Sequence, residues 1–299
     1  MLKAENMYIE QFVDYLKNEK KMSDNSLAAY KRDVLDFEKY CKKIGKDDLL
    51  EITNGEIVSY LLTLKDEGKS AATVNRKLAS VRSLYKYFSE NGMISSNPTA
   101  NIKSPRVERK DISYLTIEEV DKLLSAPDNT LKGKRDKAIF ELLYATGIRV
   151  NELVAANIED VNLRIGFFTC PGEYGRARIV PLGRPAREAI ETYLEDARDM
   201  FVKNDRQERA LFVNYYGKRM TRQGLWKLLK TYGKKVGIEE KITPHILRNS
   251  FAVHMIQNGA DLKSLQELLG HEDIAATQIY LSVTKNRIKD VYDKTHPRA

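Results

Sequence analysis

The stretch from Thr243 to Tyr280 constrains the fold most, because residues that start and end helices divide it into three short pieces. Thr243 is a typical helix N-cap, and the proline after it is common at the first helical position. Gly259 can end this helix in a left-handed conformation, Asp261 can cap a second helix, and Gly270 can end that one. The pattern predicts three consecutive helices, the last of which carries Tyr280.

Four side chains in this stretch have the chemistry needed to act on a phosphodiester. Arg248 offers a planar fork of donors that matches phosphate oxygens, and its spacing from His245 places both on one helix face. His245 and His271 can donate hydrogen bonds or transfer protons near neutral pH, and Tyr280 can be a nucleophile. Each residue alone is also typical of a packing tyrosine, a solvated helix face or a loop histidine. Their order and spacing together favour a site for phosphoryl transfer.

The motifs HILR and LLGH, followed by Tyr280, resemble those of the tyrosine recombinases, the phage-integrase family. The endings TQIYLSV and HPRA look like the Xer branch of this family, and the D type within it. The resemblance covers nearly the whole chain. It implies a site-specific DNA recombinase that cuts and rejoins strands through a 3′-phosphotyrosine, either in chromosome-dimer resolution or in the movement of a mobile element.

The resemblance also implies a role for each catalytic side chain. The sequence ATGIRVNEL matches the family motif that supplies the first catalytic arginine, here Arg149. Tyr280 would then attack phosphorus, while Arg149 and Arg248 stabilise the charge on the phosphate. His245 would be the general base, and His271 would donate a hydrogen bond to a non-bridging oxygen. The sequence has no Asp/Glu cluster typical of a two-metal site, so we expect no cofactor, no metal and no ATP.

One position departs from the family pattern. The family places a catalytic lysine on a hairpin, here expected over residues 160–182, but the matching position is Glu173. Arg176 and Arg178 lie past the turn, and an arginine is a poor acid because its pKa exceeds about 12. Either another lysine, such as Lys218, protonates the leaving oxygen, or cleavage is slow. The alternative function is therefore a cleavage-attenuated homologue that binds and bridges DNA. Relaxation by a type IB topoisomerase shares the chemistry but not the resemblance of the N-terminal part.

The fold class predicted is mainly α with a small β-sheet. Residues 1–90 show helical periodicity without strand alternation, which indicates a helical bundle, and the resemblance implies a SAM-like core-binding domain. Residues 91–113 are expected to be a basic linker, and residues 114–299 a mixed α+β catalytic domain with a terminal segment that docks on a neighbouring subunit. The helices expected in the first domain run over residues 5–19, from Ser23 or Asp24 to about Lys43, from Thr53 to about Asp66, and from Ser70.

The catalytic domain is expected to begin with a capping box of Thr116 and Glu119. A helix over residues 133–145 should end at Gly147, and Glu152 should pair with a basic side chain. Two strands are expected in 160–182, joined by a turn at residues 172–175. Further helices are expected around 184–203 and 221–236.

The net charge of +8 favours a polyanionic partner, which we expect to be double-stranded DNA. The side chains expected to contact its backbone are Lys69, Arg76, Lys77, Arg82 and Arg222. An ordinary solvated face explains this pattern of basic residues equally well, and the resemblance favours DNA. The resemblance further implies a homo- or hetero-tetramer with a second tyrosine recombinase on paired sites, and a DNA translocase of the division machinery as a further partner.

The two cysteines, Cys41 and Cys170, match no metal-binding spacing, which suits a reducing cytoplasm. The N-terminal residues MLKAENMYIEQF lack the apolar run of a signal peptide. No stretch approaches the roughly 20 apolar residues needed to span a bilayer. We therefore expect a cytoplasmic protein with no membrane partner.

Overall fold

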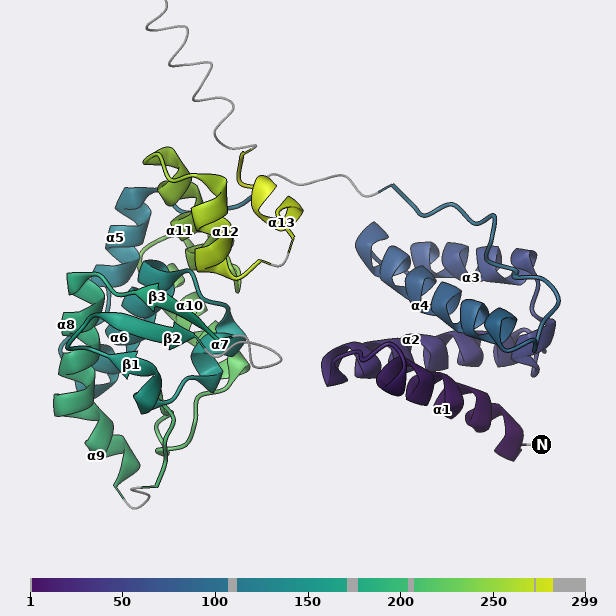
Figure 1. Cartoon of the computed structure of the whole chain (residues 1–299), viewed down its shortest axis with the longest axis horizontal. Helices are drawn as coiled ribbons and strands as arrows, with labels where there is room; N and C mark the ends of the chain where they lie inside the picture. The colour runs from purple at the N-terminus through teal and green to yellow at the C-terminus, as the bar shows by residue number, and fades with distance from the viewer. Residues whose placement is uncertain (1, 107–111, 171–176, 204–206, 272, 282–299) are drawn as a thin grey trace, which may run out of the picture. The chain divides into compact units, whose positions relative to one another are not determined.

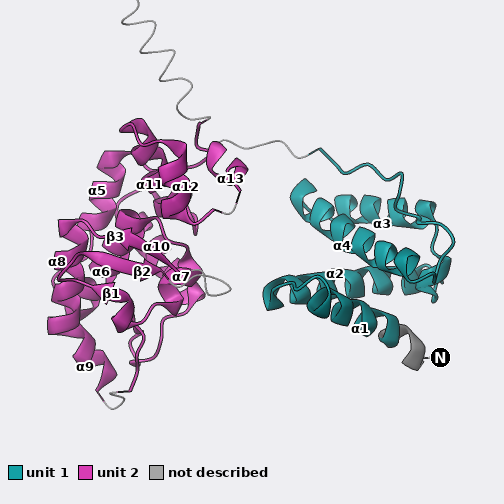
Figure 2. Ribbon diagram, viewed as in Figure 1, with its two compact units in different colours: residues 1–109 teal, residues 110–299 magenta. Residues whose placement is uncertain are grey.

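The computed structural model describes residues 2–106, 112–170, 177–203, 207–271 and 273–281, with the backbone alone for residues 2–6. The chain divides into two compact units, residues 1–109 and 110–299 (Figure 2). Each unit is built around its own hydrophobic cluster, so each is described by itself. The predicted boundaries of 1–90, 91–113 and 114–299 stay a prediction.

The first unit is helical, and no strand occurs in its described part, residues 2–106 (Figure 1). Its helices are α1 (Leu2–Asn18), α2 (Asp24–Lys43), α3 (Asn54–Asp66) and α4 (Ala71–Glu90), with a short 3-10 turn, η1 (Leu49–Glu51). The predicted caps are confirmed at α2 and α4, where Ser23 and Ser70 accept a hydrogen bond from the third residue on. Thr53 forms a capping box at α3. These short polar side chains satisfy backbone N–H groups that have no partner inside the helix, which fixes each start.

Polar contacts as well as apolar packing join the helices of the first unit. Asp33 on α2 is fully buried and pairs with Arg76 and Lys77 on α4, and Ser80 donates to it at 2.9 Å. The segment after α4 packs back on the bundle, because Ile102 is buried in its core and Asn75 donates to the carbonyl of Pro105 at 2.8 Å. This part of the expected linker therefore belongs to the first unit.

The second unit surrounds a small antiparallel sheet with helices (Figure 1). Its helical elements are α5 (Ile117–Ser125), α6 (Leu131–Thr146), α7 (Val150–Ala155), η2 (Ile158–Asp160), α8 (Arg184–Tyr193), η4 (Leu194–Arg198, a π-helix), α9 (Asp199–Val202), α10 (Arg222–Lys235), η5 (Glu239–Lys241), α11 (Ile246–Gln257), α12 (Leu262–Leu269) and α13 (Ala275–Gln278). The strands are β1 (Val161–Asn162), β2 (Phe167–Cys170) and β3 (Arg178–Pro181), with Phe168 opposite Val180.

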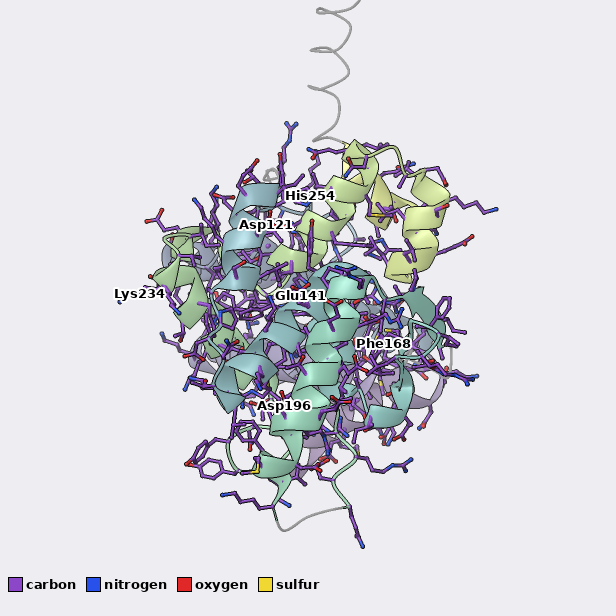
Figure 3. All side chains as sticks on the ribbon, turned by 90° about the vertical axis from the view of Figure 1, so that its left-hand side faces the viewer. Asp121, Glu141, Phe168, Asp196, Lys234 and His254 are labelled. Carbon is purple, nitrogen blue, oxygen red and sulfur yellow. The ribbon has the colours of Figure 1, made fainter. Side chains whose placement is uncertain are left out.

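Helix α6 is the central element of the second unit. It packs on α8 and α11, and it is buried around nearly its whole circumference, including the ionisable Glu141 (Figure 3). On the adjacent strand β2, Phe168 and Cys170 are buried whereas Phe167 is exposed, so one face of the sheet joins the core. Strand β3 contacts both α6 and α12, the helices that end at Gly147 and Gly270, so the sheet lies beside both of these turns.

Several expected boundaries in the second unit are confirmed and others are wrong. The capping box at Thr116 and the end of α6 at Gly147 occur as predicted, although α6 starts at Leu131 rather than at residue 133. The sheet contains three strands rather than the two expected, because β1 forms two residue pairs with the edge of β2. The expected turn at 172–175, with Glu173, lies outside the described residues. The helix expected over 184–203 is interrupted by a π-helical segment at Leu194–Arg198.

Two predicted boundaries near the C-terminus are also wrong. Thr243 does not cap α11, because its carbonyl accepts the N–H of Ile246 in a turn and the helix begins only there, with His245 at the N-cap. Tyr280 lies beyond α13 rather than on it. The N–H of Tyr280 donates to the carbonyl of Thr277, three residues earlier. An α-helix would join groups four residues apart, so this bond belongs to a 3-10 turn.

Candidate active site

Two left-handed glycines turn the chain sharply at the edges of the site. Gly147 (φ +59°) ends α6 and directs Arg149 away from it, and Gly270 (φ +62°) ends α12 just before His271. A Cβ on Gly147 would lie 2.4 Å from the ring of Phe251, so this position has room only for glycine. The two turns bring Arg149 and His271 together, although they are far apart in sequence.

Three arginines converge on the C-terminal end of α12. Arg178 donates to the carbonyl of Leu268 at 2.8 Å, Arg248 to that of Leu269 at 2.8 Å, and Arg149 to that of Gly270 at 3.2 Å. The end of a helix carries partial negative charge on carbonyls that lack intrahelical partners. The three positive charges are therefore held by the backbone of α12.

Arg248 is the more buried of the two predicted catalytic arginines, with 5% of its surface exposed. Besides its bond to α12 it donates to the carbonyl of Gly147 and to His271 Nε2, at 2.8 Å from the latter. Burial, with the nearby charge of Arg149, lowers the pKa of Arg248 to about 10. It still carries its charge at neutral pH.

Glu152 is the counter-charge of the site, as its predicted pairing with a basic side chain requires. It receives two hydrogen bonds from Arg178, at 2.8 and 3.0 Å, and one from the Arg149 side chain at 3.1 Å. The backbone N–H of Arg149 also donates to it, at 2.6 Å. Burial opposes ionisation, but these hydrogen bonds and charges outweigh it and lower the pKa of Glu152 to about 2. Glu152 is therefore a fixed anion that orients Arg149.

Arg178 is a residue whose position the sequence did not predict. It heads β3, and the only sequence signal for its role is a basic residue on the strand that follows the hairpin. Its two-point contact with Glu152 raises its pKa against the opposing effect of burial. Arg178 therefore cannot supply a proton to a leaving group.

The ring of His271 lies between Arg248 and Thr277. A guanidinium group has donors only, so Nε2 of His271 must accept the hydrogen bond from Arg248. Nδ1 then carries the proton and donates to Oγ1 of the buried Thr277, at 2.8 Å. Burial and the charges of Arg248 and Arg149 lower the pKa of His271 to about 4, so the ring is neutral at pH 7.

Arg222 lines a groove that also reaches Val150, the residue after Arg149, and His245 directly follows another lining residue. The groove has a volume of about 680 Å³ and is lined in part by Arg222, Trp226 and Pro244, the residue before His245. Burial, followed by the charges of Arg248, Arg149 and Arg222, lowers the pKa of His245. A neutral His245 has a free lone pair at physiological pH, which a general base requires.

Tyr280 is buried, with 3% of its surface exposed, in a small cluster with Phe251 and Leu269. Its hydroxyl donates to Oδ1 of Asn249 at 3.3 Å. Burial raises the pKa of Tyr280, and this effect is partly offset by Arg248, through its charge and a hydrogen bond to the hydroxyl, and by the charge of Arg149. Four of the predicted catalytic residues, Arg149, Arg248, His271 and Tyr280, thus lie around one end of α12. The fifth, His245, is near enough to Arg248 and Arg149 for their charges to lower its pKa. Tyr280 is protonated at neutral pH.

The other predicted DNA-contacting residues belong to the first unit. The Lys77 side chain is buried, with 6% of the residue exposed, and its ammonium lies 2.7 Å from Asp36. Arg76 pairs with Asp33, and Arg82 donates to Ser104 at 2.9 Å. Contacts of these residues and of Lys69 with DNA stay predictions. The burial of Lys77 argues against a contact of this side chain with DNA.

No group of three or more potential metal ligands occurs among the residues that the structure describes. In the same part of the chain, no helix is long and apolar enough to cross a membrane.

Comparisons with known proteins identify the family of the chain. Residues 113–287 match the model described as "Phage integrase family", and residues 9–92 match "Phage integrase, N-terminal SAM-like domain". The chain is 46% identical to "Tyrosine recombinase XerD" of Oceanobacillus iheyensis over 97% of its own length and 98% of the relative. It is 44% identical to the protein of the same name from Listeria monocytogenes, over 98% of its length and 100% of the relative.

Solved structures resemble the chain as well. An XerA recombinase is 27% identical and matches over 98% of this chain and 99% of its own, with a TM-score of 0.55. An XerH site-specific recombinase bound to a palindromic difH substrate, in a post-cleavage complex, has a TM-score of 0.76. It is 23% identical and matches over 95% of this chain and 83% of its own, so it supports the fold.

Proposed function

Because the chain belongs to the phage integrase family, the tyrosine recombinases, and is an enzyme that breaks and rejoins DNA strands at specific sites, we propose a role for each residue of the site. We propose that Tyr280 is its nucleophile and that Arg149, Arg248, His245 and His271 complete the active site. One observation carries this proposal: Arg149 and Arg248 aim their donors at the end of α12, beside His271 and the buried Tyr280.

In the proposed reaction the Tyr280 oxygen attacks phosphorus and the bond from phosphorus to the 5′ oxygen breaks. A 3′-phosphotyrosine forms, so the bond energy is conserved and rejoining is the same step in reverse. Arg149 and Arg248 stabilise the charge that develops on the non-bridging oxygens, and fixed charges of this kind usually make the largest contribution to catalysis. Their bonds to α12 carbonyls would be exchanged for bonds to phosphate, with Glu152 keeping Arg149 in place.

We propose that His245 accepts the Tyr280 proton, because the lowered pKa of His245 leaves its ring neutral at physiological pH. To donate a hydrogen bond to the phosphate, His271 must exchange its present hydrogen-bond partner, Arg248, for a phosphate oxygen. In the free protein its Nε2 accepts a hydrogen bond from Arg248, so it can donate to phosphate only after it gains a proton there. A bound phosphate favours that change, because its negative charge raises the pKa of a nearby histidine.

The proton for the 5′ oxygen has no assigned donor among the described residues. Glu173, which stands at the position of the family lysine, lies outside them. Arg178 is bound to Glu152, so Lys218 stays our candidate. The alternative of a cleavage-attenuated homologue is not favoured, because relatives that match over nearly the full length are named as recombinases.

We propose double-stranded DNA as the substrate and a multimer of recombinase subunits on paired sites as the active assembly. Support comes from neighbours that the fold resembles, since the XerH structure holds its difH substrate. The same proposal has finer parts. We propose a tetramer with a second recombinase, contact with a DNA translocase, and a role in chromosome-dimer resolution or mobile-element movement. We also propose a cytoplasmic location.

A nicked suicide substrate tests the assignment of the nucleophile. Cleavage next to the nick releases a short fragment, so the covalent adduct accumulates and can be measured on a denaturing gel. Tyr280→Phe should abolish the adduct and keep DNA binding nearly intact. Tyr216→Phe is the matched control, because this tyrosine is 82% exposed on the hairpin before α10. The Tyr216→Phe variant should form the adduct as the wild type does. An undiminished adduct from Tyr280→Phe would show that another residue is the nucleophile.

A further inference from the structure

Asn249 joins the proposed nucleophile to the first residues of the second unit. Its Oδ1 accepts a hydrogen bond from the Tyr280 hydroxyl at 3.3 Å, and its Nδ2 donates to the carbonyl of Ser113 at 3.0 Å. Asn249 directly follows Arg248 on α11 and has no part in the chemistry described above. A single amide group therefore connects two segments far apart in sequence.

The segment from Ile112 to Leu115 is fastened to α11 at several points. The backbone N–H of Leu115 donates to Oγ of the buried Ser250 at 2.8 Å. The ring of Tyr114 packs edge-on against His254, and both Ile112 and Tyr114 pack on the small cluster that buries Tyr280. This entry segment and the nucleophile thus share one cluster, and Asn249 is the polar link between them.

The two partners of Asn249 determine which way its amide faces. A backbone carbonyl can only accept, so the amide nitrogen must face Ser113 and the amide oxygen must face Tyr280. The Tyr280 hydroxyl must then donate its proton to that oxygen. A neutral amide oxygen is not a base, so a tyrosine bound in this way cannot lose its proton to its hydrogen-bond partner.

We propose that Asn249 is a positioning residue that holds Tyr280 in a resting orientation, and that the entry segment keeps Asn249 in place through the Ser113 carbonyl. Cleavage then requires the Tyr280 hydroxyl to leave Asn249 and reach its base. Any displacement of residues 112–115 turns the amide and releases the tyrosine. The inference rests on the proposed role of Tyr280 as nucleophile.

Two substitutions of similar size separate the two bonds of Asn249. Asn249→Leu removes both hydrogen bonds of the amide and leaves Arg248 as the polar neighbour of the Tyr280 hydroxyl. Asn249→Asp cannot donate to Ser113 but accepts from Tyr280 more strongly, because hydrogen bonds to an ionised acceptor are stronger than neutral ones. A resting bond predicts opposite effects of the two changes on cleavage, whereas simple damage to the site predicts that both slow it.

The test measures the first-turnover rate of adduct formation on the suicide substrate at saturating DNA. Asn249→Leu should react about 3- to 10-fold faster than the wild type, which is the effect of removing one net hydrogen bond from the resting state. Asn249→Asp should react more slowly. An Asn249→Leu variant that is slower or unchanged overturns the inference. If it does not fold, Asn249→Ala, which also removes both hydrogen bonds, decides by the same criterion.

A second substitution separates this inference from the proposed function. Tyr280→Phe in the Asn249→Leu background must remove the adduct completely. An adduct that persists would refute Tyr280 as the nucleophile, and with it the basis of the inference. An adduct that disappears, together with an unaltered rate for Asn249→Leu alone, would refute only the resting bond.

Discussion

Replacing Glu152 by glutamine tests the charge balance of the site, because glutamine has the shape of the protonated acid but cannot ionise. Glu152 is buried beside Arg178 and Arg149, and its pKa is about 2 against 4.5 for an unperturbed glutamate. One pKa unit is worth about 1.4 kcal/mol, so the ionised form contributes about 3 kcal/mol to the free energy of unfolding at neutral pH. Glu152→Gln should lower that free energy by a similar amount.

The pH dependence of this difference identifies its cause. A carboxyl whose pKa is lowered by folding stabilises the protein fully above the pKa of the unfolded chain, and this contribution disappears as the pH falls towards the folded pKa. Between pH 7 and pH 3 the difference between wild type and Glu152→Gln should shrink from about 3 to about 1.4 kcal/mol. A difference caused by lost packing would not change with pH.

Urea unfolding followed by circular dichroism at pH 7, 5 and 3 measures both quantities. Glu188→Gln is the control, because Glu188 forms an exposed ion pair with Arg184 at 3.1 Å and such pairs contribute less than about 1 kcal/mol. A loss below about 1 kcal/mol for Glu152→Gln at pH 7 would refute the reasoning, since each lost pKa unit is worth more than that. A loss that stays constant down to pH 3 would refute it equally.

Two further predictions concern the turns around the site. In the free protein, nitrogen-detected NMR should show His271 as the neutral Nδ1–H tautomer down to about pH 5, because burial and Arg248 lower its pKa to about 4; protonation of His271 near pH 6.5 would contradict this. Thr277→Val, which removes the acceptor of that proton, should keep the same tautomer, because Arg248 still donates to Nε2. Gly147→Ala should destabilise the second unit by about 2–4 kcal/mol in urea unfolding, from left-handed strain and the clash with Phe251. An effect below about 1 kcal/mol would mean that the turn relaxes around the methyl group.

The proposed catalytic residues were identified from local sequence patterns. HILR, LLGH and the following tyrosine are short motifs, and each depends on residue types at fixed spacings rather than on contacts with distant parts of the chain. The helix starts at Ser23, Thr53 and Ser70 were predictable for the same reason. A cap is a bond between neighbours in sequence, so its signal is local.

The boundaries around the site were less predictable. Thr243 has the right chemistry for a cap, but Pro244 and His245 take a turn before α11 begins. Tyr280 was expected on a helix and lies two residues beyond one. The first and last residues of short helices depend on packing against the rest of the unit, and a local pattern does not contain that information.

The sequence by itself determined the family and the mainly helical fold class, and it supplied the proposed catalytic residues, because these depend on residue types and short spacings. Only the tertiary structure decided the partners of these residues. The contacts of Arg178 with Glu152, of three arginines with the end of α12, and of Asn249 with Tyr280 and Ser113 join positions far apart in the chain. Such contacts, and the pKa shifts that follow from burial, exist only once distant segments have packed together.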